Sequence, residues 1–457
     1  MAGALRLQCG VGHIPDGLRR SAYKVRAIIV GAGLSGLIAA RHLHRAKWTV
    51  IVLDARDQVG GRIQTDYVDG FTLDHGFQVY LTGYQTAGQE LDLAKLQLGA
   101  FPAGAFVQLE GARYRVCDPL RSVWYMAPWH AMETLLAPVG SIADKLRIAA
   151  FRNRVCKSSP AILLGVQNVS AKERLQQMGF SETIIDRFFR PFFGGIFLDD
   201  SLSVSAGVME FVFRTFSQGQ AALPTLGMQA IPMQIASDLP RGSIRLRTTV
   251  ESVSDGSVKL SDGEVLTGDH VIIATEQPAA KRILANDVRS SGLHRASGVV
   301  TRTITPASTS CLYFEVIDPP IHEATLVLNG ESNGVINNLC FPSFAQPAYA
   351  PPGKALLSVS TIGQTESPGT ELLALVREQL SEWFGSRASS WRHLKTYRIP
   401  YALPNQSLAS FASSDKQTKI SRQIWRCGDY CETSSIEGAI QSGLNTANQM
   451  LSIEPIT

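Results

Sequence analysis

A glycine-rich turn between a buried strand and a helix constrains this chain more than any other feature. Val25–Val30 is apolar and rich in β-branched residues, which predicts a buried parallel strand. Gly31-Ala-Gly-Leu-Ser-Gly36 follows it, and Leu37–Ala46 then carries apolar residues at helical spacing. Thr49–Asp54 predicts a second buried strand. Together these segments predict a βαβ unit at one end of a parallel sheet.

The glycine spacing within this turn fits a dinucleotide. Gly31 permits the tight turn, Gly33 lets a pyrophosphate approach the backbone, and Gly36 lets the helix pack on the strand. The N-terminus of the helix offers free N–H groups and a positive dipole end to phosphate oxygens. Leu34 and Ser35 within the turn are also predicted to bind the cofactor. A glycine turn without a ligand is the alternative, and the strand and helix around it weigh against that alternative.

A second glycine pair follows the second strand. Asp54 ends that strand and is placed to accept hydrogen bonds from a ribose hydroxyl. Gly60 and Gly61 then expose backbone N–H groups, and Arg62 adds a fixed cation for phosphate oxygens. A surface turn with a solvated arginine is the alternative. The predicted half-site also includes the intervening Ala55 and Arg56.

These two runs carry a family resemblance. Val30–Gly36 and Asp54–Arg62 resemble the N-terminal signature of the flavin amine oxidase and phytoene desaturase superfamily, whose members usually carry Glu in place of Asp54. The run Asp74-His-Gly-Phe-Gln78 resembles the superfamily's following loop, which approaches the flavin ring. The resemblance therefore implies FAD as the cofactor, with Phe77 and Gln78 beside it.

Three short motifs near the C-terminus resemble the second flavin element of the same superfamily: Cys427-Gly-Asp429, Ser435-Ile-Glu-Gly-Ala439 and Ser442-Gly443. The resemblance implies that a strand delivers Gly428 and Asp429 toward the ribityl or pyrophosphate region. The N-terminus of a helix then presents N–H groups to the electron-rich end of the reduced ring. An ordinary helix whose glycines serve close packing is the alternative. The contacts predicted for this helix are Ile436, Glu437, Gly438 and Ala439.

Weaker resemblances cover the middle of the chain. Val250 matches a superfamily position where a strand backbone meets the adenine, and Ala274 matches a strand end near the cofactor. Residues Arg190–Phe197 and Pro224–Met228 resemble carotenoid desaturase-like and protoporphyrinogen oxidase-like members. The resemblance thus touches both ends and the centre of the chain.

The segments predict an α/β chain with α+β inserts. A length of 457 residues suggests two or three domains. We predict a Rossmann-like FAD-binding domain assembled from residues 25–80, 222–299 and 398–457, a discontinuous substrate-binding domain from residues 81–221 and 300–397, and an N-terminal extension of residues 1–24. Further strands are predicted at 243–253, 257–267, 270–275, 310–317 and 424–429, and helices at 371–384 and 434–451.

Eight phenylalanines fall between residues 188 and 216. Most of them are expected in a core, and a few are expected to line a lipophilic pocket. Hydride transfer to a flavin needs a substrate C–H bond held over the ring and water kept away. We therefore expect an FAD-dependent oxidoreductase that removes hydride from a small lipophilic substrate, as desaturases do, and passes electrons to a quinone or oxygen. No catalytic residue is assigned.

Two other functions stay open from the sequence. An amine or amino-acid oxidase that produces hydrogen peroxide is one, and the resemblance implies that such enzymes hold a Lys near the flavin. Ser310 stands where that Lys is expected on the strand Thr309–Tyr313, which favours a desaturase. A flavin-bound isomerase or binding scaffold without redox turnover is the other. His75 and Tyr430 lie near the predicted flavin loops without an assigned role.

Charge and cysteine content limit the partners and the compartment. The formal net charge is +4 and the basic residues are scattered, so no nucleic-acid partner is expected. Seven widely spaced cysteines predict neither a disulfide framework nor a metal site, and favour a reducing cytoplasmic location. Residues 1–24 fit either a cleaved organelle peptide or a ragged bacterial N-terminus.

An aromatic stretch at residues 122–129 precedes a basic helical run. Such a pairing can dock on an anionic membrane surface, so a peripheral membrane contact is one interpretation. A solvated helix face over a local core is the other, and it is the one that this pattern favours. The basic residues of the run are Lys145, Arg147, Arg152, Arg154 and Lys157.

Overall fold

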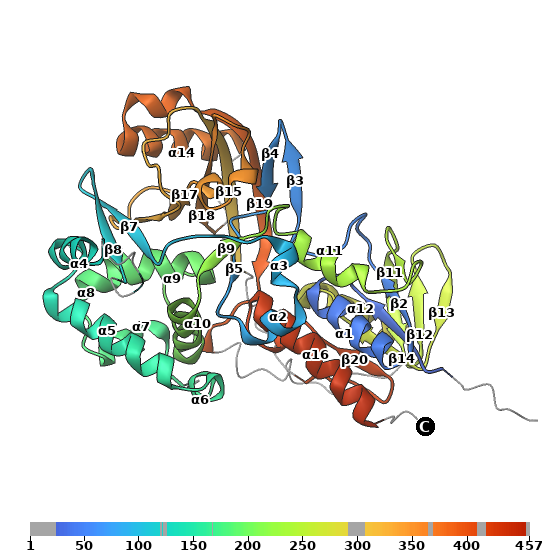
Figure 1. Ribbon diagram of the computed structural model, residues 1–457. Helices are drawn as coiled ribbons and strands as arrows, with labels where there is room; N and C mark the ends of the chain where they lie inside the picture. Colours follow the sequence, from blue (N-terminus) through green and yellow to red (C-terminus); the bar gives the residue numbers. More distant parts are fainter. Residues whose placement is uncertain are drawn as a thin grey trace, which may run out of the picture.

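A parallel sheet forms the body at the right of Figure 1, beside an all-helical lobe and a larger mixed sheet. The computed structural model describes residues 24–118, 121, 126–166, 168–290, 307–363, 369–408 and 417–453. Apart from Lys24, the predicted N-terminal extension lies outside the described residues. In the part of the chain that is described, no helix combines the length and the apolarity needed to cross a bilayer.

The parallel sheet has five strands, and the first βαβ unit supplies its centre. Its strands are, in spatial order, β10 (Ile244–Arg245), β2 (Thr49–Leu53), β1 (Arg26–Val30), β14 (His270–Ile273) and β20 (Ile424–Arg426). The chain winds from β1 to β2 on one side, while β14 pairs with β1 on the other. Because the winding reverses at β1, a crevice opens at the carboxyl ends of β1 and β14.

Both faces of β1 are covered, as its continuous apolar run predicts. Ala27 and Ile29 pack in one core cluster with α1 and α16, whereas Ile28 and Val30 pack with the antiparallel strands on the opposite face. The helices around the sheet are α1 (Leu34–Arg45), α2 (Gln85–Glu90), α3 (Leu93–Leu96), α11 (Ala230–Ser237), α12 (Gln277–Ser290) and α16 (Ile436–Ile453).

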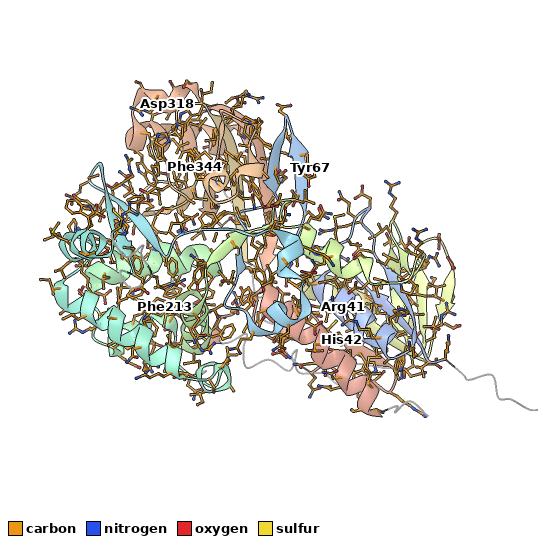
Figure 2. The ribbon with its side chains drawn as sticks, in the orientation of Figure 1. Arg41, His42, Tyr67, Phe213, Asp318 and Phe344 are labelled. Carbon is orange, nitrogen blue, oxygen red and sulfur yellow. The ribbon has the colours of Figure 1, made fainter. Side chains whose placement is uncertain are left out.

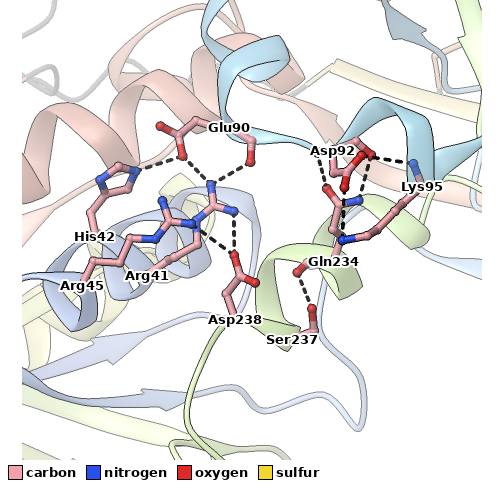
Figure 3. Close-up of polar contacts among 9 residues, drawn as sticks. All are labelled: Arg41, His42, Arg45, Glu90, Asp92, Lys95, Gln234, Ser237 and Asp238. Atoms are coloured by element: carbon pink, nitrogen blue, oxygen red, sulfur yellow. Dashed lines mark hydrogen bonds and ion pairs between the residues drawn. The ribbon is translucent and has the colours of Figure 1, made fainter.

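A buried arginine ties three of these helices together (Figure 3). Arg41 of α1 is 2% exposed and forms an ion pair with Glu90 at the end of α2. Its other terminal nitrogen lies 3.4 Å from the carboxylate of Asp238, which follows α11. His42 also contacts Glu90, at 2.9 Å. This cluster fixes the outer side of α1, whose N-terminus faces the crevice.

The predicted strand at 243–253 is two strands in two different sheets. Its first part is β10 of the parallel sheet, and its second part, β11 (Val250–Ser254), begins an antiparallel sheet of three strands. Arg247 between them has a φ of 52°, which no strand accommodates. The predicted strand at 257–267 is a hairpin, in which a turn at residues 261–263 joins the other two strands of this sheet, β12 (Ser257–Leu260) and β13 (Val265–Thr267).

A seven-stranded mixed sheet forms the upper body of Figure 1, with α14 on its outer face. Its strands are, in spatial order, β19 (Arg392–Leu403), β15 (Ala307–Val316), β18 (Ala355–Ile362), β17 (Asn338–Cys340), β16 (Leu326–Asn329), β7 (Gly104–Leu109) and β8 (Ala112–Cys117); the helices beside it are α13 (Pro342–Ala345) and α14 (Gly369–Phe384). β19 runs through residue 397, so it spans a predicted domain boundary. The division into domains itself stays a prediction.

The helical lobe, defined as α4 to α10, follows β8. It comprises α4 (Ala127–Leu136), α5 (Ile142–Lys157), α6 (Pro160–Leu164), α7 (Ala171–Gln177), α8 (Glu182–Ile184), a π-helical turn (Ile185–Phe189), α9 (Arg190–Phe197) and α10 (Ala206–Gln218). Its core is rich in phenylalanine, and Figure 2 shows Phe213 inside it.

Two small sheets lie between these bodies. The hairpin of β3 (Thr65–Val68) and β4 (Phe71–Asp74) carries the exposed Tyr67 (Figure 2). A second sheet orders β5 (Tyr80–Leu81), β9 (Ala221–Leu223) and β6 (Gly99–Ala100). The loop between β4 and β5 therefore passes from the hairpin to the crevice of the parallel sheet.

Candidate functional site

One cavity of about 1140 Å³ runs from the crevice of the parallel sheet into the helical lobe. Most of the residues predicted to bind the cofactor line it, although they come from both ends and the centre of the chain. These lining residues are Gly31, Gly33, Leu34, Ser35, Asp54, Ala55, Arg56, Gly60, Gly61, Arg62, Phe77, Gln78, Val250, Ala274, Gly428, Asp429, Ile436 and Ala439. The remaining three, Gly36, Glu437 and Gly438, do not line it.

Two glycines of the first turn, Gly33 and Gly36, have different surroundings. A Cβ built on Gly33 would meet no atom within 4 Å, so this position borders open space. A Cβ on Gly36 would lie 2.1 Å from the carbonyl oxygen of Gly31 and 3.0 Å from Cβ of Ala274. Gly36 thus lets α1 start against β1 and β14, which is why it stays out of the cavity.

Asp54 organises the rim beside this turn. One carboxylate oxygen accepts a hydrogen bond from the backbone N–H of Ala32 at 2.7 Å, and the other accepts one from the N–H of Arg56 at 2.9 Å. Each oxygen keeps a lone pair for a further donor, such as a ribose hydroxyl. The backbone of Thr248 donates to the Asp54 carbonyl at 2.8 Å, which brings the segment before Val250 to the same end of the cavity.

Arg62 joins the two predicted half-sites. Its guanidinium lies 2.7 Å from the carboxylate of Asp429 and donates to the Ala402 carbonyl at 2.7 Å. The preceding Gly61 lies against the first glycine turn, because a Cβ built on Gly61 would lie 3.4 Å from Cα of Gly33. An ion pair between the N-terminal and C-terminal motifs therefore closes one wall of the cavity.

The loop after β4 is anchored at one end and open at the other. Buried Asp74 accepts hydrogen bonds from Thr65 at 2.5 Å, from Tyr349 at 2.7 Å and from the backbone of Met228 at 2.8 Å. This anchoring aims the following residues at the cavity, where His75, Gly76, Phe77 and Gln78 all form part of the wall.

In the described part of the wall, two buried polar atoms have neither a hydrogen bond nor an ion pair within the protein. They are Oε1 of Gln78 and Oγ1 of Thr275, both on lining residues. A buried polar group without a partner is costly, so each atom calls for a ligand group. Together with the open space at Gly33, these atoms fit a polar dinucleotide bound along the crevice.

His75 belongs to a charged network behind this loop. Its Nε2 lies 3.1 Å from a carboxylate oxygen of Asp66, which also accepts hydrogen bonds from Tyr397 at 2.7 Å and from Lys395. Burial opposes ionisation, but the hydrogen bonds from Lys395, Tyr397 and His75 lower the pKa of Asp66 to about 2. Asp66 is therefore a carboxylate at neutral pH and orients the ring of His75.

The C-terminal motif, like the first turn, contains residues that line the cavity and a glycine that serves packing. Gly428 and Asp429 lie at the end of β20, and the N–H of Gly428 donates to Ser442 at 3.0 Å. A Cβ on Gly438 would lie 1.9 Å from the Thr433 carbonyl oxygen, so this glycine serves close packing. Cofactor contacts of Gly438 stay a prediction.

Glu437 has a structural partner. Its carboxylate accepts hydrogen bonds from three backbone N–H groups at the start of α2: those of Gln85 at 3.1 Å, Thr86 at 2.8 Å and Ala87 at 2.8 Å. The side chain caps a neighbouring helix and points away from the cavity. A contact with the cofactor also stays a prediction for Glu437.

The cavity holds residues that the sequence reasoning missed. Glu276 and Arg282 line it after β14, and Thr433 and Ser434 line it before α16. Their neighbours in sequence carried the motif signal, but the residues themselves match no motif. Tyr430, in contrast, packs in the core cluster beneath β14 and is not part of the wall.

Inside the helical lobe the cavity becomes an apolar chamber. Five of the eight phenylalanines line it, more than the few expected: Phe188, Phe192, Phe197, Phe213 and Phe216. Phe213 also stacks on Phe151 of α5, with ring centroids 4.5 Å apart. Phe189, Phe193 and Phe211 lie in the core behind this wall, as expected for most of the set.

The strand compared with the lysine-bearing strand of amine oxidases is β15, and it borders the cavity. Thr309, not Ser310, lines the cavity on β15, and Ser310 is buried in the sheet. Among the described lining residues the one lysine is Lys145, which belongs to α5 and not to the sheet.

A model of the family described as flavin containing amine oxidoreductase matches residues 34–451. The chain belongs to this family. It is an FAD-dependent oxidoreductase. The crevice as the binding site of that FAD stays a prediction. The resemblance recognised in the two sequence signatures is confirmed.

The curated relatives of this flavoenzyme include short local matches and a match over nearly the whole chain. Polyamine oxidase 3 of Oryza sativa is 43% identical over 61 residues, which span 13% of this chain and 13% of that protein. Hydroxysqualene dehydroxylase of Rhodopseudomonas palustris is 23% identical over 455 residues, which span 93% of this chain and 97% of the relative. The local match is closer, and the second match covers nearly the whole chain.

Solved structures share the flavoenzyme's fold. A putrescine oxidase bound to putrescine aligns with a TM-score of 0.66 at 17% identity, covering 94% of this chain and 99% of its own. A protein titled as a protoporphyrinogen oxidase from Exiguobacterium aligns with a TM-score of 0.67 at 17% identity, covering 95% and 100%. These likenesses confirm the mixed α/β class with a Rossmann-like FAD-binding unit.

Proposed function

We propose that this flavoenzyme transfers hydride between FAD and a lipophilic substrate, and that it acts as a desaturase. The observation that carries the proposal is the continuity of the cavity from the crevice into a chamber walled by aromatic side chains. Such a chamber gains affinity from burying apolar substrate surface, at roughly 25 cal/mol per Å². It offers little to a polar substrate.

Bound FAD would accept the hydride released when a substrate C–H bond breaks, with the proton of the neighbouring carbon lost to solvent. The chain's own residues hold the apolar substrate and exclude water. Phe188, Phe192 and Phe216 supply flat walls, and Thr309 and Phe77 also line the cavity. Holding the reacting carbon in place accounts for most of what a protein contributes to such a step.

Oxidation of an amine is the weaker candidate for this chamber. On the lobe side, the charged residues that line the described part of the wall are Asp118, Arg121, Lys145 and Arg152. The carboxylate among them, Asp118, lies 2.9 Å from Arg152. An ammonium substrate would therefore meet more cations than free acid groups.

In a second candidate reaction, hydride passes from the reduced flavin to the substrate. The relative that matches nearly the whole chain is named for removing a hydroxyl group from hydroxysqualene. In that reaction class a carbon–oxygen bond breaks, hydroxide leaves, and hydride from reduced flavin takes its place. The same apolar chamber would serve, but a reductant must first supply electrons to the flavin.

We propose a quinone or oxygen as the acceptor in the desaturase direction. A non-redox isomerase or scaffold is the remaining alternative, since a UDP-galactopyranose mutase shares the fold at a TM-score of 0.67. We also propose a reducing cytoplasmic location with peripheral contact to membranes.

Anaerobic mixing of the purified holoprotein with a donor panel tests these candidates. Bleaching of the flavin absorbance by a polyene or a saturated isoprenoid, but not by putrescine or spermidine, is the expected result. Bleaching by amines with peroxide formation in air would overturn it. Chemically reduced enzyme that is reoxidised anaerobically by a hydroxylated triterpene would favour the second candidate. A flavin that no donor reduces and no hydroxylated triterpene reoxidises would favour the non-redox alternative.

A further inference from the structure

Helix α4 is packed with its polar side inward. Glu133 pairs with Arg115 at 3.1 Å, and Thr134 accepts from the N–H of Cys117 at 3.2 Å, so these side chains fasten the helix to β8. No residue of α4 is buried. The apolar side faces outward, which is the reverse of an ordinary surface helix.

The outward apolar side chains continue onto the next helix. They are Trp129, Met132, Leu135 and Leu136 of α4, with Ile142 and Leu146 of α5, and their exposed fractions run from 44% to 73%. Six large exposed apolar residues on two consecutive helices form a candidate apolar patch. Such patches mark interaction surfaces in most proteins that have them. Figure 1 shows α4 and α5 at the outer end of the helical lobe.

Two residues of this patch also line the chamber. Of the large exposed apolar residues in the described part of the chain, those that also line the cavity are Leu135 and Leu146. A side chain that is both exposed and part of the wall marks an opening. The cavity therefore opens between α4 and α5, within the apolar patch.

The charge around the opening is positive. Residues 126–166 contain five Lys or Arg and two acids. Both acids are engaged within the protein: Glu133 with Arg115, and the buried Asp144 with the start of α5. Arg154 forms an ion pair with Glu210, and Arg152 forms one with Asp118. On α5, Arg147 and Lys157 are exposed, and Arg147 lies 3.5 Å from Asp144. The half-buried Lys145 donates to the carbonyls of Leu135 and Ala137 and lines the cavity.

We infer that α4 and α5 dock on the surface of an anionic lipid bilayer, with the chamber opening toward the acyl chains. An apolar helix face rimmed by cations, with tryptophan at its edge, has the composition of an interfacial membrane helix. The docking itself rests on the patch, and the entry of a lipid-soluble substrate through it rests on the proposed function. Residues 122–125 of the aromatic stretch lie outside the described residues and are not part of the inference.

Vesicle flotation of the FAD-loaded protein tests this inference. Phosphatidylcholine vesicles with and without phosphatidylglycerol are the probes. The test variant combines Trp129→Gln with Leu136→Gln, because neither side chain lines the cavity. The matched control combines Val265→Gln with Ile317→Gln, two exposed apolar residues, at 57% and 77% exposure, that lie outside the helical lobe. Flavin absorbance and thermal unfolding verify that each variant is folded.

We expect the wild type and the control to float with anionic vesicles, and the α4 variant to bind them about tenfold more weakly. Binding should also weaken in high salt. Equal binding by all three proteins, or none by the wild type, overturns the inference. The inference is also overturned if the wild type is a dimer in solution and the α4 variant is a monomer, because a second copy of the chain then covers the patch. Flavin reduction by a detergent-solubilised polyene is independent of these outcomes, so failure of docking and failure of the proposed function are distinguishable.

Discussion

Gly33 and Gly36 belong to the same sequence motif but have different structural surroundings. Gly33 borders open space, whereas Gly36 touches the carbonyl of Gly31. A methyl group at Gly33 would therefore meet the cofactor before it met the protein. The same group at Gly36 would meet the backbone. The two positions separate a binding defect from a folding defect.

Gly33→Ala should fold and fail to hold FAD. Its backbone φ of −78° suits alanine, so the unfolding temperature of the cofactor-free protein should stay within about 2 °C of wild type. Loss of close approach to the pyrophosphate should reduce FAD affinity at least about tenfold. Flavin fluorescence titration of apoprotein measures the affinity. Full occupancy in this variant would contradict the placement of the pyrophosphate.

Gly36→Ala is the matched comparison. Its added methyl group conflicts with backbone and not with a flexible side chain, so it should lower the unfolding temperature of the cofactor-free protein. A variant as stable as Gly33→Ala would show that α1 can shift without cost.

Single residues of the site were predictable where a motif fixes backbone geometry. The lining positions in both glycine turns follow from the strand–turn–helix pattern and lie in the cavity. The pairing of Arg62 with Asp429 could not be predicted, because sequence gives each residue a local role and no partner. Likewise no local sequence feature indicates that the carboxylate of Glu437 caps the start of α2.

Capping contacts give the elements their positions. At the start of α5, Asp144 accepts hydrogen bonds from the backbone and side chain of Ser141, and from the backbone and side chain of Ser181 before α8. Burial raises the pKa of Asp144, but these hydrogen bonds outweigh it and lower the pKa to about 2. The carboxylate therefore joins two segments of the helical lobe only while it is ionised.

Stability of the lobe should accordingly fall in acid through Asp144. A pKa below the unfolded value of about 3.9 means stability that is present above pH 4 and lost as pH falls toward 2. The contribution is about 2 kcal/mol. Urea unfolding of wild type and Asp144→Asn between pH 2 and 7 measures it. The difference in unfolding free energy should shrink as pH falls. A difference independent of pH would assign the loss to shape instead of charge.

Glu437→Gln tests the role of that side chain as a cap. A neutral amide has one oxygen to offer the three N–H groups of α2, so the unfolding free energy should fall by about 1–2 kcal/mol. FAD affinity of the folded variant should be unchanged. A large loss of affinity at unchanged stability would instead support the cofactor contact predicted from the motif. Differential scanning calorimetry and flavin titration separate the two results.

Elements with strong periodicity were predictable, and breaks within them were not. The predicted helix at 434–451 corresponds to Ile436–Ile453, and the strand at 310–317 to Ala307–Val316. The predicted strand at 243–253 failed because Arg247 adopts a left-handed conformation. That conformation is imposed by long-range hydrogen bonds from Arg247 and Thr248 to the loop around Asp54 and Arg56.

The cavity is a property of the whole molecule. Its wall combines residues from the first turn, from the end of the chain and from the helical lobe. Composition indicated an apolar pocket near the phenylalanines but could not show that it joins the crevice. Nor could it show that α4 turns its apolar side outward, because amphipathic spacing fixes two faces without saying which one packs.

A cofactor bound along this wall should hold the two ends of the chain together. The residues that face it belong to segments far apart in sequence, and one ion pair, Arg62 with Asp429, already links them. FAD binds the folded state, so it should add RT ln(1 + [FAD]/Kd) to the unfolding free energy, about 2.7 kcal/mol at a hundredfold excess over Kd. Thermal scans of apoprotein against FAD concentration measure this gain.

The same scans with FMN, which lacks the adenosine half, isolate the contribution of the crevice near Asp54 and Val250. If both halves of the wall hold the cofactor, FMN should raise the unfolding temperature less than FAD at equal concentration. In Gly33→Ala the FAD curve should flatten toward that of the apoprotein, because the pyrophosphate can no longer approach. An FMN curve that equals the FAD curve would place the whole binding free energy in the FMN half of the cofactor. It would also show that the crevice near Asp54 and Val250 does not contribute to cofactor binding.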